Sequence, residues 1–240
     1  LSMALIAVGA IATVYGVVGD HSEHHQRTWS ALLVNGFFFL GISLGALFFY
    51  ALQNATETAW SVLVKRVFEG IMAFLPIGAG VMVLVLAAGS MHLHHIYHWM
   101  DASLYDVNDP NYDEAMAGKQ AFLNLPFYWI RTIAYLAVFI LFARWFRKKS
   151  LEMDGLTGDS LLKTHLLTYR RGALFLVFFA VFSSTLAWDW LMSIDALWFS
   201  TLFGWYVFSG MWVSAMITGV VLVLYLKRKG YLPQVNNSHI

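Results

Sequence analysis

The chain has 240 residues, of which 59% are hydrophobic and 12% charged, and its mean hydropathy is +0.63. A soluble domain has roughly 45–50% apolar and about 25% charged residues, so this composition indicates an integral membrane protein. The net charge is +1 and basic residues are not interleaved with aromatics in a polar setting, so we expect no nucleic-acid partner. The absence of cysteine excludes disulfides, thiolate metal sites and covalently attached c-type haem on this chain.

Long apolar runs predict six membrane spans, at about 3–18, 29–52, 62–89, 123–143, 172–192 and 197–226. All but the first reach the roughly 20 residues that a helix needs to cross hydrocarbon. The runs lack two-residue alternation, which excludes a barrel. The expected fold class is all-α, a polytopic transmembrane helix bundle forming one domain over 1–240. Because Leu1 opens within an apolar run, without Met or a basic flank, we expect a fragment of a longer chain.

The numbers of basic residues on the two sides of the predicted membrane bundle differ strongly. One side, formed by 19–28, 90–122 and 189–198, has three: Arg27 and Lys119 within these segments and Arg131 in the adjoining part of the fourth span. The same segments hold nine of the fourteen acids. The other side holds twelve, namely Lys65, Arg66, Arg144, Arg147, Lys148, Lys149, Lys163, Arg170, Arg171, Lys227, Arg228 and Lys229. The positive-inside rule therefore predicts that the start of the fragment, the 144–171 loop and the C-terminal end face the cytoplasm.

The 144–171 stretch has enough apolar residues for a short helix lying at the membrane interface, with its basic residues against anionic headgroups. An ordinary cytoplasmic loop explains it equally well. In the second span, Gly41 and Gly45 form a small-xxx-small pair, which favours close helix contact.

Ionisable residues within spans are the first functional candidates, because lipid penalises an unpaired charge. Glu69 follows Lys65 by four residues and Arg66 by three, so helical spacing allows either cation to pair with it. Glu69 is either the entry of a cytoplasmic proton half-channel or the anchor of a structural ion pair. Pro76 further along this span frees a carbonyl and can kink the helix.

Asp189 and Asp195 flank the turn between the fifth and sixth spans and are the second candidates. Hydroxyls at 183–185 precede Asp189 by one to two turns and could hold a proton-conducting file of water. In the alternative, Asp195 caps the sixth span and the hydroxyls bond to their own helix. Arg131 in the fourth span is either a counter-charge for one of these acids or snorkels outward.

Seven of the nine histidines lie on the acidic side, in two groups: His92, His94, His95 and His98, and His21, His24 and His25. His94 and His98 are spaced i, i+4, which on a helix would suit a metal or an axial haem ligand. Their clustering at a span end instead favours histidines of an interface or a partner contact. His92 is kept as a weak candidate for proton transfer.

Three segments resemble a known family. These are TWSALLVNGFFFLGISLGALFFYALQNATETAWSVLVKRVFEGIMAFLP, LNLPFYWIR and WDWLMSIDALWFSTLFGWYVFSG, spread over about 28–212. They are similar to the F subunit (ActF) family of bacterial alternative complex III, a quinol:cytochrome c oxidoreductase. The most specific pattern is D-W-x-M-S-x-D-x-x-W-F-S-T, which begins at Asp189.

The resemblance implies a fold like that of the NrfD/PsrC membrane proteins, in which about ten spans form two four-helix bundles and extra helices. It implies a multi-pass subunit of the bacterial inner membrane that scaffolds sister membrane and periplasmic subunits, with a terminal oxidase as a further partner. Haem c, iron–sulfur clusters and the quinol would then belong to the complex, and this chain would bind no cofactor and perform no catalysis by itself. Glu69 and Asp189 are carried over as candidates for a proton path, with Asp195, Arg131 and His92 as weaker ones.

Three other functions stay open at this point. The chain could be a b-type cytochrome that uses the histidines of the acidic side, or a subunit with a quinone docked between its aromatic-rich spans. It could also be a secondary transporter, for which we would expect paired broken helices near mid-membrane. Only Pro76 lies well inside a span, and the second half of the sequence offers no matching proline.

Overall fold

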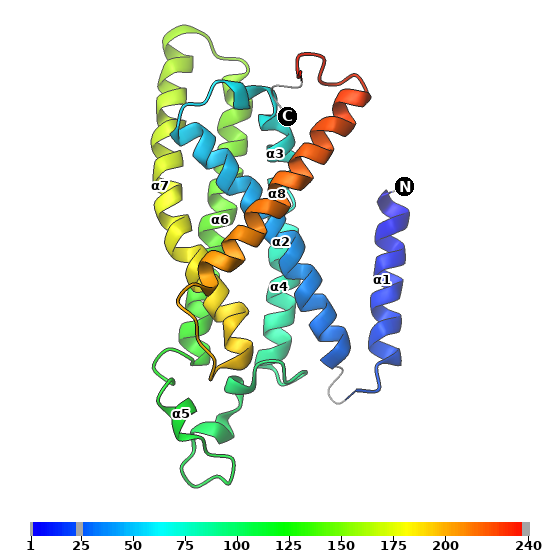
Figure 1. Cartoon of the computed structure of the whole chain (residues 1–240), viewed down its shortest axis with the longest axis vertical. Coiled ribbons are helices and arrows are strands. Elements are labelled where there is room, and N and C mark those ends of the chain that lie inside the picture. The colour runs from blue at the N-terminus through cyan, green and yellow to red at the C-terminus, as the bar shows by residue number, and fades with distance from the viewer. Residues whose placement is uncertain (1, 23–25, 237–240) are drawn as a thin grey trace.

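The computed structural model describes residues 2–22 and 26–236, and this part of the chain is all-helical, with no β-strand (Figure 1). Five helical stretches are long and apolar enough to cross a membrane. They are α2 (Gln26–Ala55), α3 (Lys65–Met72) with α4 (Leu75–Ser90), α6 (Leu125–Met153), α7 (Gly158–Trp190) and α8 (Phe203–Arg228). The all-α prediction is confirmed for this part of the chain, and five of the six expected spans meet these criteria of length and composition.

The remaining expected span, 3–18, forms helix α1 (Ser2–Gly19), which is apolar but shorter than the other five. It contacts the rest of the chain mainly through α2 and stands apart from the bundle (Figure 1). From Met3 to Tyr15 its residues are exposed. No soluble fold would leave such a helix uncovered, because each apolar side chain left in water forgoes the stabilisation that burial gives.

The third expected span is interrupted between α3 and α4, at Ala73 and Phe74. Pro76 lies in the first turn of α4, where its missing N–H is tolerated. In a continuous helix the backbone nitrogen of residue 76 would donate to the carbonyl of Met72. Proline has no N–H, so this bond cannot form and the helix breaks there. The kink expected at Pro76 is therefore confirmed, and α6, α7 and α8 run without such an interruption.

The structure corrects the prediction for 144–171. This stretch is neither a helix lying at the interface nor an extended loop, because α6 continues to Met153 and α7 begins at Gly158. Only a short turn separates the two helices. At 1.5 Å per residue, α6 and α7 are about 44 and 50 Å long, well beyond a hydrocarbon layer of about 30 Å. Both helices therefore extend past the membrane core at the end that carries most of the basic residues.

Helices α2 and α8 cross at the centre of the bundle (Figure 1), and α2 also packs against α7 and α4. The crossing depends on Gly45, because a Cβ atom there would lie 2.6 Å from the carbonyl oxygen of Met211 and 2.7 Å from Cβ of Ala215. Gly41 faces the side chain of the same methionine. The prediction that this glycine pair allows close helix contact is confirmed.

Phenylalanines of α6 and α7 fill the middle of the bundle. Phe139, Phe146 and Phe175 are completely buried and Phe179 is 2% exposed. Their rings contact one another at tilted or edge-on angles, with centroids 5.7–6.2 Å apart, the arrangement that aromatic pairs prefer. These four side chains are called the phenylalanine layer below.

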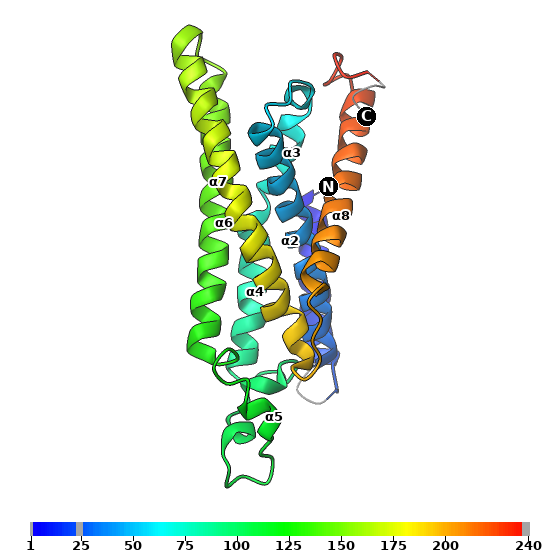
Figure 2. The ribbon, with the colours of Figure 1, turned by 60° about the vertical axis from the view of Figure 1, so that its left-hand side comes forward.

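A small lobe projects from the end of the bundle opposite the α6–α7 turn (Figures 1 and 2). It includes short helices over Ala102–Tyr105 and, as α5, Glu114–Ala117. The lobe carries five acids, Asp101, Asp106, Asp109, Asp113 and Glu114. We call this end of the bundle the acidic end, and the end with the α6–α7 turn the basic end.

Candidate functional site: two buried carboxylate clusters

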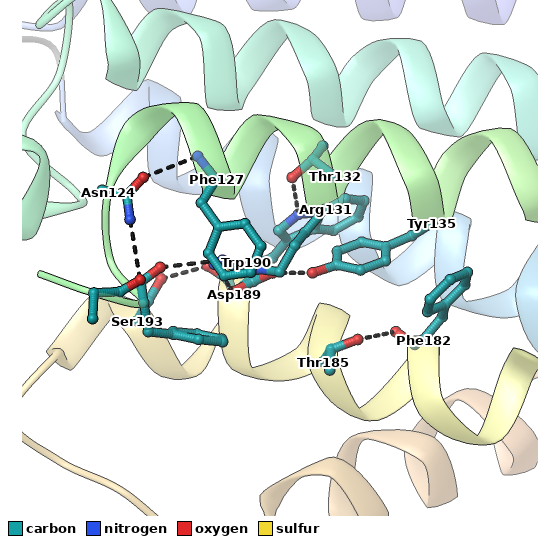
Figure 3. A network of polar contacts seen from close by, with 12 residues as sticks. Asn124, Phe127, Arg131, Thr132, Tyr135, Phe182, Thr185, Asp189, Trp190 and Ser193 are labelled. Atoms are coloured by element: carbon teal, nitrogen blue, oxygen red, sulfur yellow. Dashed lines mark hydrogen bonds and ion pairs between the residues drawn. The ribbon is translucent and has the colours of Figure 1, made fainter. Parts of the chain in front are cut away.

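The first cluster surrounds Asp189, whose side chain is completely buried near the end of α7 (Figure 3). Arg131 of α6 donates two hydrogen bonds to it, from Nε to Oδ2 at 2.8 Å and from Nη2 to Oδ1 at 2.7 Å. The Tyr135 hydroxyl, one turn further along α6, also donates to Oδ2. Asp189 is thus held by a bidentate ion pair and a third donor, the arrangement that a buried carboxylate requires.

Further contacts hold the guanidinium in place. The carbonyl of Phe122 accepts a bond from Arg131 Nη1 at 3.1 Å. The guanidinium carbon lies 4.0 Å from the ring centroid of Phe122 and 4.2 Å from that of Phe127, within the range of cation–π attraction. Arg131 is only 10% exposed, so it is a counter-charge for Asp189 and does not snorkel outward.

Hydrogen bonds next to Asp189 fasten the end of α7 to its neighbours. The Trp190 indole donates to Thr132 Oγ1 at 3.2 Å, and the Tyr97 hydroxyl donates to the Trp190 carbonyl at 2.8 Å. The Ser193 hydroxyl donates to the backbone carbonyl of Asp189. These bonds connect α7 both to α6 and to the loop after α4, so the cluster fixes three segments that are distant in sequence.

The second cluster surrounds Glu69 of α3, whose side chain is also completely buried. Arg66 Nη1 donates to Glu69 Oε2 at 2.7 Å, and Arg147 and Ser150 of α6 also donate to the carboxylate. Arg66 continues to Asp154 in the α6–α7 turn. The two arginines are 34% and 44% exposed, so they lie between Glu69 and the water at the basic end.

The two clusters lie on opposite sides of the phenylalanine layer. Tyr135 and Arg147 are twelve residues apart on α6, which corresponds to about 18 Å of helix. Phe139 and Phe146 occupy the buried face between them. Within the described residues, no chain of hydrogen-bonded polar side chains crosses this layer, so each carboxylate belongs to one end of the bundle.

Two of the three hydroxyls before Asp189 bond to their own helix, which is the second of the two arrangements considered from the sequence. Ser184 donates to the Ala180 carbonyl at 3.2 Å and Thr185 to the Val181 carbonyl at 3.0 Å, both within α7. Asp195 is exposed and accepts from the backbone of Leu197 and Trp198, both at 3.3 Å. The expectation that Asp195 caps the sixth span is wrong, because α8 begins only at Phe203.

The histidines of the acidic side do not share a helix face. Residues 91–97 leave the helix, with His92 exposed and at a φ of 56°. His94 is 2% exposed, with Nε2 3.0 Å from the Val85 carbonyl and Nδ1 accepting from the Ile96 backbone N–H at 3.3 Å. Burial lowers the pKa of His94, which keeps it neutral with both ring nitrogens engaged. His24 and His25 lie outside the described residues.

No family model matches the chain, and a search of curated proteins finds no match. What the chain does is therefore inferred from its two clusters and from the resemblance described above.

Several residues of the two carboxylate clusters were not predicted from the sequence. Tyr135 follows Arg131 by four residues, so both lie on one face of α6, a spacing that would have revealed it. Arg147 and Ser150 are three residues apart and share a face in the same way. Their pairing with Glu69, about eighty residues earlier, could not be read from spacing, because it depends on how α3 packs against α6.

Proposed function

We propose that the chain is a non-redox integral membrane subunit of a quinol-oxidising respiratory complex, similar to the F subunit of alternative complex III. In this role it scaffolds sister membrane and periplasmic subunits of the bacterial inner membrane. Haem c, iron–sulfur clusters and the quinol site belong to those partners, and a terminal oxidase is a further partner. The basic end faces the cytoplasm, as the positive-inside rule requires, and α1 is the sixth span.

The buried Arg131–Asp189 pair is the observation that supports this proposal most. Arg131 ends the segment LNLPFYWIR and Asp189 begins the pattern D-W-x-M-S-x-D-x-x-W-F-S-T, the segments on which the resemblance depends most. Two short motifs distant in sequence thus meet at one clamp between helices. A shared clamp is a physical reason for the motifs to occur together, and it favours a rigid, NrfD/PsrC-like bundle that scaffolds other subunits.

The positions of the described histidines favour a scaffold over a b-type cytochrome. Bis-histidine haem ligation needs two histidines on facing helices within the membrane. At the acidic end, His21, His92, His94 and His95 lie in loops and His98 in a short 3-10 helix, whereas His165 lies at the basic end. A haem absorption band in the purified single subunit would overturn this choice.

Purification of the tagged chain from native membranes in mild detergent tests the proposal. We expect it to co-purify with polypeptides that carry haem c and iron–sulfur clusters, and the assembly to oxidise quinol. Migration as a single polypeptide, without haem absorption or quinol oxidation, would contradict the assignment.

Proton exchange at Glu69 and Asp189 is a secondary proposal. It is favoured by the position of Glu69, which is separated from water at the basic end only by two half-exposed arginines. Asp195 and His92, both exposed at the acidic end, are weaker candidates. Complexes with Glu69→Gln or Asp189→Asn that still assemble should, after reconstitution, translocate fewer protons per electron. An unaltered ratio in both variants would remove the proposal.

A further inference from the structure

A cavity of about 600 Å³ opens at the basic end, beside the Glu69 cluster, whose outermost carboxylate, Asp154, also lines it. It lies between the end of α2, the turn that follows it, the start of α3 and the α6–α7 turn. Its volume is within the range of ligand sites, about 300–1,000 Å³. Since α6 and α7 extend past the hydrocarbon layer here, the cavity lies at the level of the lipid headgroups.

The lining of the cavity combines apolar and charged side chains. Phe49, Phe68, Leu161 and Leu162 supply apolar surface. An amphipathic ligand with a polar head fits such a lining better than a wholly polar or wholly apolar one.

The charges of the lining are of both signs. Lys65 brings an ammonium group that no described residue engages in an ion pair or hydrogen bond. Glu57 and Asp154 bring carboxylates that are 54% and 56% exposed. Glu57 already lies 3.3 Å from His165, and Asp154 pairs with Arg66. A carboxylate has about four acceptor sites, so each can accept a further donor.

We propose that this cavity binds the head of a zwitterionic phospholipid with a primary ammonium, phosphatidylethanolamine in chemical class. The phosphate lies against Lys65, and the ammonium donates to Glu57 and Asp154. The start of an acyl chain packs against the apolar side chains of the lining. A trimethylated ammonium cannot donate hydrogen bonds to the two carboxylates, and the head of phosphatidylglycerol carries no cation to place against them. Lys65 is therefore a lipid-binding residue rather than only a member of the positive-inside pattern.

Native mass spectrometry of the purified full chain with lipids of identical acyl chains tests this proposal. The probes are phosphatidylethanolamine, phosphatidylcholine, phosphatidylglycerol and inorganic phosphate. We expect phosphatidylethanolamine to bind tightest, and Lys65→Gln to weaken it about tenfold, as loss of one charge-assisted hydrogen bond implies. Glu57→Gln should reduce the preference for phosphatidylethanolamine over phosphatidylcholine.

Lys148→Gln is the matched control, because Lys148 is an exposed cation of the same end that does not line the cavity. It should leave the affinity unchanged, and all variants should keep the thermal midpoint of the lipid-free parent. Equal weakening by Lys65→Gln and Lys148→Gln would show surface electrostatics only and overturn the proposal. So would equal binding of phosphatidylethanolamine and phosphatidylcholine, a preference for phosphatidylglycerol, or binding of inorganic phosphate that matches the lipid.

Discussion

A double-mutant cycle on Arg131 and Asp189 measures how strongly the acidic-end cluster holds α6 to α7. In Asp189→Leu, the guanidinium of Arg131 stays 10% exposed without its counter-ion. In Arg131→Met, the carboxylate stays completely buried with only the Tyr135 hydroxyl as a side-chain donor. Breaking a buried pair in this way costs about 3–5 kcal/mol, since it leaves one charge uncompensated. Each single variant should thus shift the unfolding equilibrium by about 10²–10⁴.

The double variant is the informative one. With both charges replaced by apolar side chains of similar size, no buried charge is left unpaired, and such replacements are often nearly neutral. We expect its loss of stability to fall short of the sum of the two single losses by about 2 kcal/mol or more. Reversible unfolding of the purified chain in mixed micelles, at one fixed detergent composition, measures all four free energies.

Asp195→Asn supplies the control for this cycle. Asp195 is an exposed acid of the same end, so its substitution should change stability by less than about 0.5 kcal/mol. Additive single losses, or single losses no larger than that of the control, would refute the claim that the pair holds the two helices together.

Three further predictions concern packing and pH. Gly45→Val should disrupt the α2–α8 crossing and lower the thermal midpoint sharply, whereas Gly80→Ala, where an added Cβ meets nothing within 4 Å, should be tolerated. Phe139→Ala should cost about 3–5 kcal/mol of unfolding free energy, and Leu141→Ala, on the exposed face of α6, much less; equal losses would contradict the assigned core. Hydrogen bonds from the Ser22 hydroxyl and from Thr28 in the first turn of α2 lower the pKa of Asp20, so the contribution of Asp20 to stability should be complete above about pH 4 and be lost as the pH falls through the lowered pKa. Spin-label distances between α1 and α2 should therefore broaden in acid, and Asp20→Asn should show no such pH dependence.

The apolar spans could be predicted because hydrocarbon imposes a minimum length on every helix that crosses it. Their ends could not be predicted as well, since Lys, Arg, Glu and Leu in 144–171 form helices as readily in water as at a membrane. The turn between α6 and α7 is marked only by Gly155 and by Gly158, which has a φ of 57°. Two glycines are weak evidence for a turn when the residues on either side are charged and favour helix.

The two sites differ in how far the sequence revealed them. Arg131 was considered as a counter-charge for an acid of the next span, and the structure selects Asp189. For Glu69, spacing indicated Lys65 or Arg66 as the partner, and the structure selects Arg66 but adds Arg147 and Ser150 from another helix. Partners on the same helix follow from residue spacing. Partners on other helices depend on how the helices pack, which residue spacing does not reveal.

The phenylalanine layer has an electrical consequence. A voltage across a membrane falls mainly over the region of lowest dielectric constant, and moving one elementary charge through all of it changes the free energy by about 2.3 kcal/mol per 100 mV. Here that region is the aromatic middle of the bundle, and the ionised groups of each end lie outside it. The drop in potential therefore does little work on either group of charges, and the bundle should keep one conformation whether or not the membrane is energised.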